Sequence, residues 1–160
     1  MKTLILTTGG TIDKVHDTYT ESLVMADATL LPGLLSIGRT DHPRIQTLLM
    51  KDSLDMTKDD RDLILRAILN ASEDNIVLTH GTGTMEITAQ FLDGKTNNKT
   101  VVLTGAMRPF SLGKSDAGFN IGGALVACQI LEKGVYGVMN GRVFPAKDLR
   151  KDTKQGRFDC

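Results

Sequence analysis

A short pattern that recurs three times constrains the fold of this chain more than any other feature of its sequence. Each copy is a run of apolar, β-prone residues that ends in threonine and glycine, and the copies are residues 4–11 (LILTTGGT), 76–82 (IVLTHGT) and 101–106 (VVLTGA). Apolar runs without polar alternation are typical of strands that are covered on both faces, as in a parallel sheet. The pattern therefore predicts buried parallel strands, each followed by a turn.

Helical patterns lie between these strands. Thr57 and Asp60 resemble a capping box ahead of one helix, a second helix is expected to begin near Thr84, and residues 121–131 favour a third. Further strands are expected at residues 44–50 and 135–139. Strands that alternate with helices predict an α/β fold, a three-layer α/β/α sandwich with a mainly parallel sheet that is Rossmann-like or flavodoxin-like.

The composition argues against several functional classes. The length of 160 residues suits one domain, so we expect a single domain over residues 1–160, and a formal net charge of zero gives no reason to expect binding to nucleic acid or to a membrane surface. Every apolar run is shorter than the roughly 18–20 residues of a membrane span, and residues 1–6 are too short for a signal peptide. Cys128 and Cys160 make no disulfide framework, so the expected compartment is the cytoplasm.

The first turn carries a candidate nucleophile. In open α/β sheets the site lies beyond the carboxyl ends of the strands, so the three threonine–glycine turns should face one crevice. Gly9 and Gly10 let the backbone turn sharply and approach a ligand, and Thr11 would then present its hydroxyl. A threonine hydroxyl is a weak nucleophile that needs a base or a polarising partner. A tight turn in which Thr11 caps the next segment is an equally good reading of this motif alone.

The second turn offers groups that suit an anion. Thr82 and Thr84 could place hydroxyl and backbone N–H groups at a helix start, although simple N-capping explains them as well. His80 is either a base or a structural hydrogen-bond donor, and the structural role is the commoner one. No G-x-S-x-G sequence accompanies it, which argues against a Ser-His-Asp triad.

Three basic residues complete the candidates. Arg108 could bind a carboxylate with both of its terminal nitrogens, but a role in pinning a loop through carbonyl groups is the favoured interpretation. Lys147 and Lys151 lie near the end of the sequence. A lysine that is desolvated in a crevice can serve as a base, whereas a lysine in a charged tail is usually solvated.

Taken together and in this order, the motifs resemble those of the bacterial L-asparaginase family over the whole length of the chain. The matching stretches are residues 8–12 (TGGTI), 52–57 (DSLDMT), 79–86 (THGTGTME), 105–109 (GAMRP) with Asp116, Phe119 and Asn120 after it, and 148–151 (DLRK). The resemblance implies the fold of the asparaginase N-terminal domain, with one crossover of left-handed sense. The family's small C-terminal domain is expected to be absent.

The resemblance also implies an activity and the residues that carry it. The activity is hydrolysis of the side-chain amide of asparagine, or of a related small amide, through a threonine acyl-enzyme without a cofactor. Family members are dimers or tetramers, so a homodimer or a higher homo-oligomer is expected. The implied catalytic residues are Thr11 as nucleophile, Tyr19 as its assistant, and Thr82 and Lys151 as the activating group; the implied substrate-binding residues are Gly10, Ser53, Gly81 and Gly83.

Two positions depart from the family pattern. The second motif normally carries an aspartate where this chain has Gly83, and periplasmic-type members often carry a glutamine where it has Leu54. In the family that aspartate faces the α-ammonium of the substrate, as does an acidic group of the C-terminal domain. Losing a carboxylate from a desolvated charged pair costs on the order of 2–5 kcal/mol, so recognition of an amino acid is weakened while the nucleophile is kept. Three acids could replace it in space: Asp13, Asp17 and Asp116.

Other readings remain open. The main alternative is a catalytically weak or inactive domain of the same fold that binds a small acid or a protein partner, and release of ammonia would separate the two. A nucleotide-binding module is disfavoured because neither G-x-G-x-x-G nor G-x-x-x-x-G-K-[ST] occurs at the strand ends. Three scattered histidines without a Cys/His cluster suggest no metal site.

Overall fold

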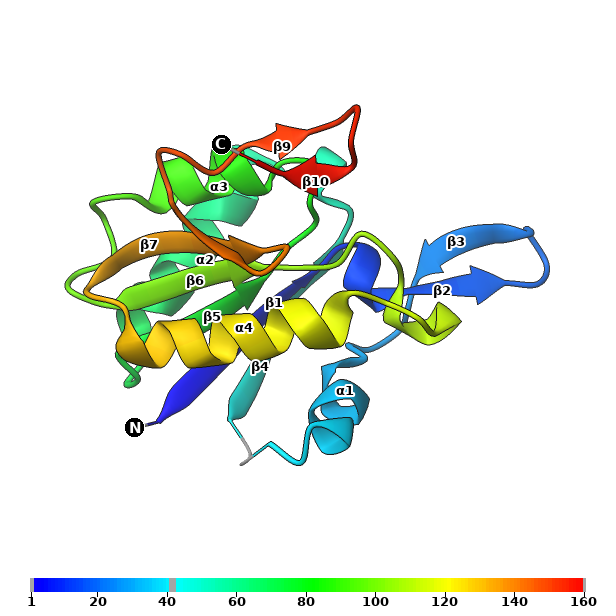
Figure 1. Cartoon of the computed structure of the whole chain (residues 1–160), viewed down its shortest axis with the longest axis horizontal. Helices are drawn as coiled ribbons and strands as arrows, with labels where there is room; N and C mark the ends of the chain where they lie inside the picture. Colours follow the sequence, from blue (N-terminus) through cyan, green and yellow to red (C-terminus); the bar gives the residue numbers. More distant parts are fainter. Residues whose placement is uncertain (1, 41–42, 160) are drawn as a thin grey trace.

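A six-stranded sheet in the order β4-β1-β5-β6-β7-β8 forms the middle layer of the computed structural model, which describes residues 2–40 and 43–159 (Figure 1). Neighbouring strands are parallel except for β7 and β8. The predicted mainly parallel sheet is therefore confirmed. The strands are β1 (Thr3–Gly9), β4 (Arg44–Lys51), β5 (Asn75–Thr79), β6 (Thr100–Thr104), β7 (Gly134–Met139) and β8 (Arg142–Pro145).

Strand β8 was not predicted from the sequence, although a signal for it was there. It pairs with β7 across a turn made of Asn140 and Gly141, whose φ angles are 55° and 75°. Asn-Gly between two β-prone segments is a strong signal for a tight hairpin, because both residues adopt positive φ at low cost.

Within the described residues, the helices are α1 (Leu31–Ile37), α2 (Lys58–Asn70), α3 (Met85–Leu92) and α4 (Ala117–Ile130). Helices α2 and α3 pack on the sheet face that carries Leu4 and Leu6, whereas α1 and α4 pack on the face that carries Ile5. The capping box predicted from Thr57 and Asp60 is present at the start of α2. The two apolar cores confirm the predicted three-layer arrangement.

Two successive crossovers in this sheet have opposite hand. The connection from β5 to β6 runs through α3, and the connection from β6 to β7 runs through α4. Both step one strand in the same direction, but α3 and α4 lie on opposite faces of the sheet. One of the two is therefore left-handed, against the usual rule, as the resemblance implied.

Short elements surround the carboxyl ends of the strands. Strands β2 (Lys14–Asp17) and β3 (Ser22–Met25) form a hairpin that projects from the body of the domain (Figure 1), and β9 (Lys151–Asp152) pairs with β10 (Arg157–Phe158). Cys128 is a buried free thiol, and Cys160 lies outside the described residues. None of the helices in the described part of the chain is long and apolar enough to cross a membrane.

Candidate active site

The turns that follow β1, β4 and β5 touch one another through their backbones. A Cβ atom added to Gly10, whose φ is 86°, would lie 2.5 Å from the backbone nitrogen of Gly81. A Cβ atom added to Gly81 would lie 2.6 Å from both Cβ and Oγ of Ser53. Glycine is required at both positions, because a side chain would separate the turns. We call Gly10, Thr11, Ser53, Gly81, Thr82 and Lys151 the carboxyl-edge site.

Thr82 and Lys151 are bonded to each other in this site. The Nζ atom of Lys151 donates to Thr82 Oγ1 over 2.8 Å, and Thr82 is only 7% exposed. The backbone N–H of Lys151 donates to the carboxylate of Glu86 over 3.2 Å, so the first turn of α3 holds the lysine segment in place. The other candidate lysine, Lys147, is exposed to solvent, as expected for a lysine in a charged tail.

The hydroxyl of Thr11 is available for chemistry. Thr11 begins the short 3₁₀ turn Thr11–Asp13 directly after Gly10, and its side chain is partly exposed. Its hydroxyl has no hydrogen-bond partner within residues 2–40 and 43–159, so it caps no segment there. The turn is fixed instead by the buried carboxylate of Asp13, which accepts from the backbone N–H of Leu30 over 2.8 Å.

Among residues 2–40 and 43–159, Ser53 Oγ accepts one hydrogen bond and donates none. Only 1% of Ser53 is exposed, and its Oγ accepts from the backbone N–H of Thr84 over 3.2 Å. Its carbonyl oxygen accepts from Thr84 Oγ1 over 2.8 Å. The serine is thus held at two points by one residue, and its hydroxyl proton remains for an acceptor such as a carboxylate.

Tyr19 is not brought to the other candidates. It lies in the loop between β2 and β3 with 97% of its surface exposed, and its backbone N–H donates to the Asp17 carboxylate over 2.9 Å. The structure therefore unites Thr82 and Lys151 beside the Thr11 turn and leaves Tyr19 outside.

The three acids considered as replacements for the motif aspartate are all engaged elsewhere. Each accepts hydrogen bonds from residues other than Ser53 and Thr82. Burial raises the pKa of Asp13, although the backbone N–H of Leu30 opposes the shift. The contacts are Asp13 with Thr29 and Leu30, Asp17 with Tyr19 and Thr20, and Asp116 with Met107, Arg108 and Asn120.

Arg108 pins a loop, as the favoured interpretation predicted. Its Nε donates to the carbonyl of Gly113 over 2.8 Å, and one terminal nitrogen donates to the carbonyl of Leu112 over 3.3 Å. These bonds use the side chain to close the segment ahead of α4.

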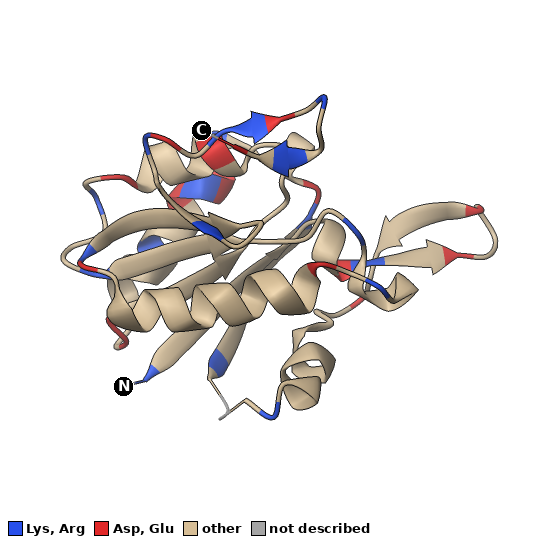
Figure 2. Cartoon of the chain, viewed as in Figure 1, with Lys and Arg blue, Asp and Glu red and all other residues tan. Residues whose placement is uncertain are grey.

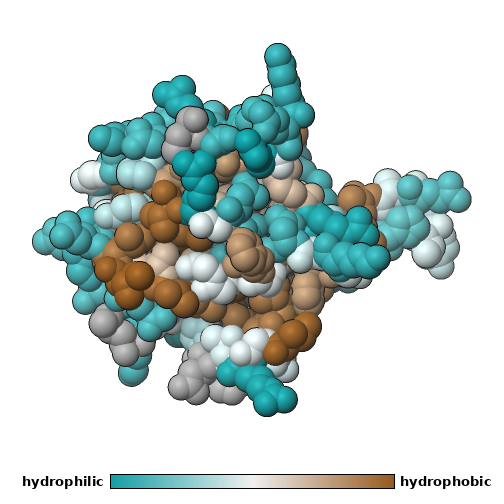
Figure 3. Space-filling view, viewed as in Figure 1, coloured by the Kyte–Doolittle hydropathy of each residue, from teal (hydrophilic) through white to brown (hydrophobic). Residues whose placement is uncertain are grey.

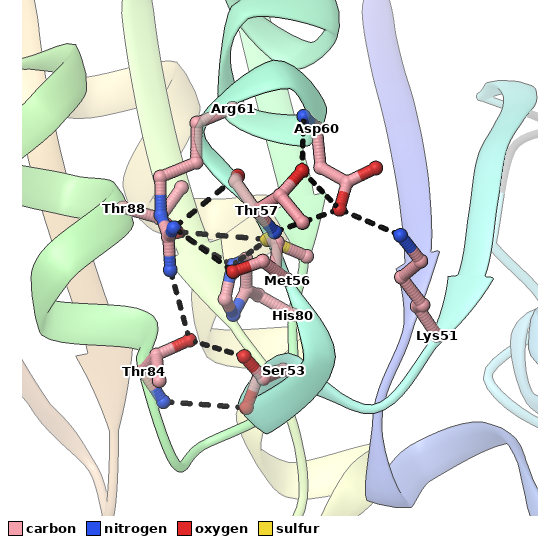
Figure 4. A network of polar contacts seen from close by, with 9 residues as sticks. All are labelled: Lys51, Ser53, Met56, Thr57, Asp60, Arg61, His80, Thr84 and Thr88. Carbon is pink, nitrogen blue, oxygen red and sulfur yellow. Dashed lines mark hydrogen bonds and ion pairs between the residues drawn. The ribbon is translucent and has the colours of Figure 1, made fainter.

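His80 is a structural donor rather than a base. Its Nδ1 lies 2.7 Å from the carbonyl oxygen of Gly81, and because a carbonyl only accepts, Nδ1 carries the proton. Its Nε2 then accepts from the hydroxyl of Thr88 over 2.8 Å (Figure 4). Burial lowers the pKa of His80 to about 4, so the imidazole is neutral at pH 7 and fully used in bonding.

Sequence reasoning missed Arg61, which lies behind this histidine. Arg61, Ile64 and Ile68 are the buried residues of α2, at the spacing of one helix face. An arginine on the apolar stripe of an amphipathic helix is a signal for a buried polar network, because the rest of that stripe faces the core. The network is drawn in Figure 4.

Gly83 sits where a side chain could be accommodated. Unlike Gly10, it has no positive φ. A Cβ atom there would meet the side-chain end of Leu54 at 2.9 Å and Ser53 Oγ at 3.2 Å. Leu54 is largely exposed and able to move, so the backbone does not demand glycine, and a side chain at this position would be directed at Ser53.

Comparison with known proteins gives a consistent result. Residues 2–160 match the family described as Asparaginase, N-terminal. The chain is 35% identical over 159 residues to the probable periplasmic L-asparaginase of Haemophilus influenzae (92% of this chain, 45% of that protein) and 34% identical over 161 residues to L-asparaginase 2 of Escherichia coli (92% and 45%). It is 35% identical over 151 residues to one of the subunits of the glutamyl-tRNA(Gln) amidotransferase of Methanococcus maripaludis (86% and 34%).

Solved structures agree with the sequence matches. The thermostable L-asparaginase from Thermococcus kodakarensis superposes with a TM-score of 0.84 at 30% identity, covering 99% of this chain and 51% of that one. The probable cytoplasmic L-asparaginase from Campylobacter jejuni superposes with a TM-score of 0.80 at 28% identity (94% and 49%). This chain thus spans about half the length of the asparaginases that it matches. It belongs to the asparaginase family, and it corresponds to the N-terminal part of that family's members.

Proposed function

We propose that this chain carries the nucleophile of an amidohydrolase that hydrolyses the side-chain amide of asparagine or of a related small amide. The observation that supports the proposal best is the 2.8 Å contact between Lys151 Nζ and Thr82 Oγ1, next to the glycine turn that presents Thr11. A threonine with an unbonded hydroxyl beside a hydroxyl–amine pair is the arrangement that activation of a weak nucleophile requires.

The proposed reaction is acyl transfer through Thr11. Its Oγ1 attacks the amide carbon while its proton passes to the pair of Thr82 and Lys151. The C–N bond then breaks, and the nitrogen takes up that proton and leaves as ammonia. Water attacks the resulting ester, the Thr11 oxygen leaves with a proton, and the acid is released.

Backbone groups of the same turns would stabilise the oxyanion. The N–H groups of Thr11 and Thr82 donate to no protein acceptor in the described part of the chain. Preorganised donors of this kind are commonly the largest contribution to catalysis of acyl transfer. Tyr19 would assist Thr11 only when the hairpin of β2 and β3 folds over the site.

Ammonia release tests the proposal. Purified protein would be incubated with asparagine, glutamine and succinamate, and ammonia would be measured with an enzyme-coupled assay. Turnover of at least one of these amides that disappears in Thr11→Ala supports the proposal. Ammonia release that persists in Thr11→Ala, or its absence with all three amides, contradicts it.

The second candidate function is a catalytically weak domain that binds a small acid. Gly83 favours it, because a glycine at this position next to Ser53 offers no carboxylate to receive an α-ammonium group. Calorimetric titration with aspartate and succinate would detect this binding in the absence of turnover. Binding without ammonia release would select this candidate.

We also propose that two copies associate through α4. This helix has no charged residue, and Figure 2 shows no coloured segment along it. Phe119, Val126 and Ile130 of α4 are exposed and line an apolar groove together with Val143 of β8. Figure 3 shows hydrophobic side chains gathered over this face. A helix with apolar residues on its solvent side is usually covered, and a twofold axis would cover it with its own copy.

A further inference from the structure

Arg61 is a buried cation without an acidic partner among the described residues. It is 9% exposed, and the acceptors that its guanidinium has there are all neutral oxygen atoms. Within residues 2–40 and 43–159, no carboxylate forms an ion pair with it, since Asp60 beside it is bonded to Lys51 and Thr57. A buried charge with no counterion is costly, so its retention calls for an explanation. The four bonds run to the Met56 carbonyl (3.2 Å), the Thr57 carbonyl (3.3 Å), Thr88 Oγ1 (3.0 Å) and Thr84 Oγ1 (3.3 Å).

One branch of this network leads from Arg61 to Ser53. Thr84 Oγ1 accepts from the guanidinium and donates in turn to the Ser53 carbonyl over 2.8 Å (Figure 4). The direction of the Thr84 proton is fixed, because an arginine cannot accept. A hydroxyl that accepts from a cation is also a stronger donor. The guanidinium thus orients the residue that holds Ser53 at both its carbonyl and its hydroxyl.

The other branch leads from Arg61 to Gly81. The Nε of Arg61 donates to Thr88 Oγ1, the Thr88 hydroxyl donates to His80 Nε2, and His80 Nδ1 donates to the Gly81 carbonyl. Gly81 is the residue that packs against both Gly10 and Ser53. Two chains of hydrogen bonds therefore start at one guanidinium and end on the two turns that enclose the free hydroxyl of Ser53.

Two carboxylates near this part of the site are bonded to groups other than Arg61. Asp52 pairs with Lys14 over 2.6 Å, and Glu86 accepts from the Lys151 backbone. The positive charge of Arg61 is therefore not cancelled by a hydrogen-bonded acid. Its field reaches the neighbouring imidazole, where after the larger effect of burial it helps to lower the pKa of His80.

We propose that Arg61 is a positioning residue that sets Ser53 to bind a carboxylate, and that its charge makes this end of the site selective for small amides that carry one. Arg61 acts through Thr84 and has no bond to the reacting atoms. The inference rests on the proposed function for its substrate, but its effect on binding can be measured without turnover.

The kinetic test compares two amides that differ in the carboxylate. Succinamate has an amide and a carboxylate, and propionamide has the amide alone. In Arg61→Met, kcat/KM should fall at least about tenfold more for succinamate than for propionamide, mainly through KM, as expected for loss of a hydrogen bond to a charged group. Arg61→Lys keeps the charge but not the planar fork and should recover part of the loss. Arg66→Met alters an exposed position on α2 and is the matched control. It should change kcat/KM for neither substrate.

The binding test uses succinate as the probe. Calorimetry should show binding at least about tenfold weaker in Arg61→Met than in the unmodified chain, with melting temperatures recorded for both. Weaker succinate binding with no ammonia release from any amide would refute the proposed function and leave this inference standing. Equal losses for succinamate and propionamide, or unchanged succinate binding in a folded Arg61→Met protein, would overturn the inference.

A second variant decides the matter if Arg61→Met does not fold. Thr84→Val keeps the shape of the side chain and removes the hydroxyl that links Arg61 to Ser53. It should give the same selective loss on succinamate. In a double-mutant cycle, Arg61→Met combined with Thr84→Val should lower kcat/KM for succinamate little more than either substitution alone, because both act through one chain of hydrogen bonds. The inference would be overturned if the losses of the two variants were fully additive, or if Thr84→Val lowered kcat/KM equally for succinamate and propionamide.

Discussion

Lys151 and Thr82 lie 69 residues apart in the sequence, yet Lys151 Nζ and Thr82 Oγ1 are joined by a 2.8 Å hydrogen bond. The bond places the amine of the lysine against a hydroxyl that is nearly buried, beside the turns that bear Thr11 and Ser53. This contact is the centre of the proposed proton relay.

The first prediction concerns Lys151 itself. Lys151→Met keeps the length and apolar stem of the side chain but cannot accept or donate a proton. We expect kcat for amide hydrolysis to fall at least about 100-fold, the usual contribution of one acid–base group, with little change in KM. Steady-state ammonia release measures both constants. Lys147→Met is the control, because Lys147 is exposed and should be silent. An unchanged kcat in Lys151→Met would show that Lys151 takes no part in proton transfer.

The second prediction concerns Gly83. Its backbone has no positive φ, and a Cβ atom there would displace the exposed end of Leu54, press lightly on Ser53 Oγ at 3.2 Å and direct the side chain toward Ser53. Gly83→Asp should raise kcat/KM for asparagine about tenfold or more, since tenfold corresponds to about 1.4 kcal/mol of ion pairing with the α-ammonium. The same change should lower kcat/KM for succinamate, which offers no ammonium group.

The control for this change is Gly83→Asn, which has the same shape without the charge. It should leave the preference between asparagine and succinamate as it is. Thermal melting of both variants separates lost folding from lost activity. A well-folded Gly83→Asp protein with no gain on asparagine would show that the missing carboxylate does not limit the reaction.

The third prediction is a pH dependence of stability that comes from His80. The folded protein holds the pKa of His80 at about 4, below its ordinary value of 6.5, because the ring is buried. The unfolded chain therefore binds more protons between these values, and the stabilisation by neutral His80 is complete above pH 6.5 and lost as the pH falls toward 4.

His80→Gln removes this titration. The difference in free energy of unfolding between the unmodified chain and His80→Gln should shrink by up to about 3 kcal/mol from pH 7 to pH 4. Urea unfolding at several pH values measures it. A difference that stays constant over this range would show that His80 is not held neutral by the fold.

The fourth prediction concerns assembly. The unmodified chain should be a dimer by light scattering at tens of micromolar, and Ile130→Lys should make it monomeric by placing a charge on the apolar face of α4. Ile87→Lys is the control, because Ile87 is also exposed but lies on α3. A monomeric unmodified chain would refute the dimer. An Ile130→Lys protein that stays dimeric would show that the interface does not lie on α4.

Much of the fold could be predicted because it depends on local patterns. Uninterrupted apolar runs marked β1, β5 and β6, and the Thr57 capping box marked the start of α2. The hairpin of β2 and β3 was not predicted, because β2 has no apolar run and the apolar run of β3 is only three residues long.

The site was predictable only in part, because its contacts join distant segments. From the residue types alone, Thr11, Thr82 and Lys151 could equally be capping or solvated residues. Only the resemblance to the asparaginase family assigned them catalytic roles. Arg61 was missed because it acts over long range: its bonds to Thr84 and Thr88 cross from α2 to the start of α3. No local pattern encodes such a pairing.

The proposed acyl transfer depends most directly on the hydroxyl of Thr11. The decisive measurement is ammonia release from succinamate and asparagine by the unmodified chain and by Thr11→Val, which replaces the hydroxyl with a methyl group of nearly the same volume. If Thr11 is the nucleophile, the unmodified chain releases measurable ammonia and Thr11→Val releases none, while the melting temperatures of the two proteins stay close. Equal release of ammonia by both proteins would show that Thr11 is not the nucleophile.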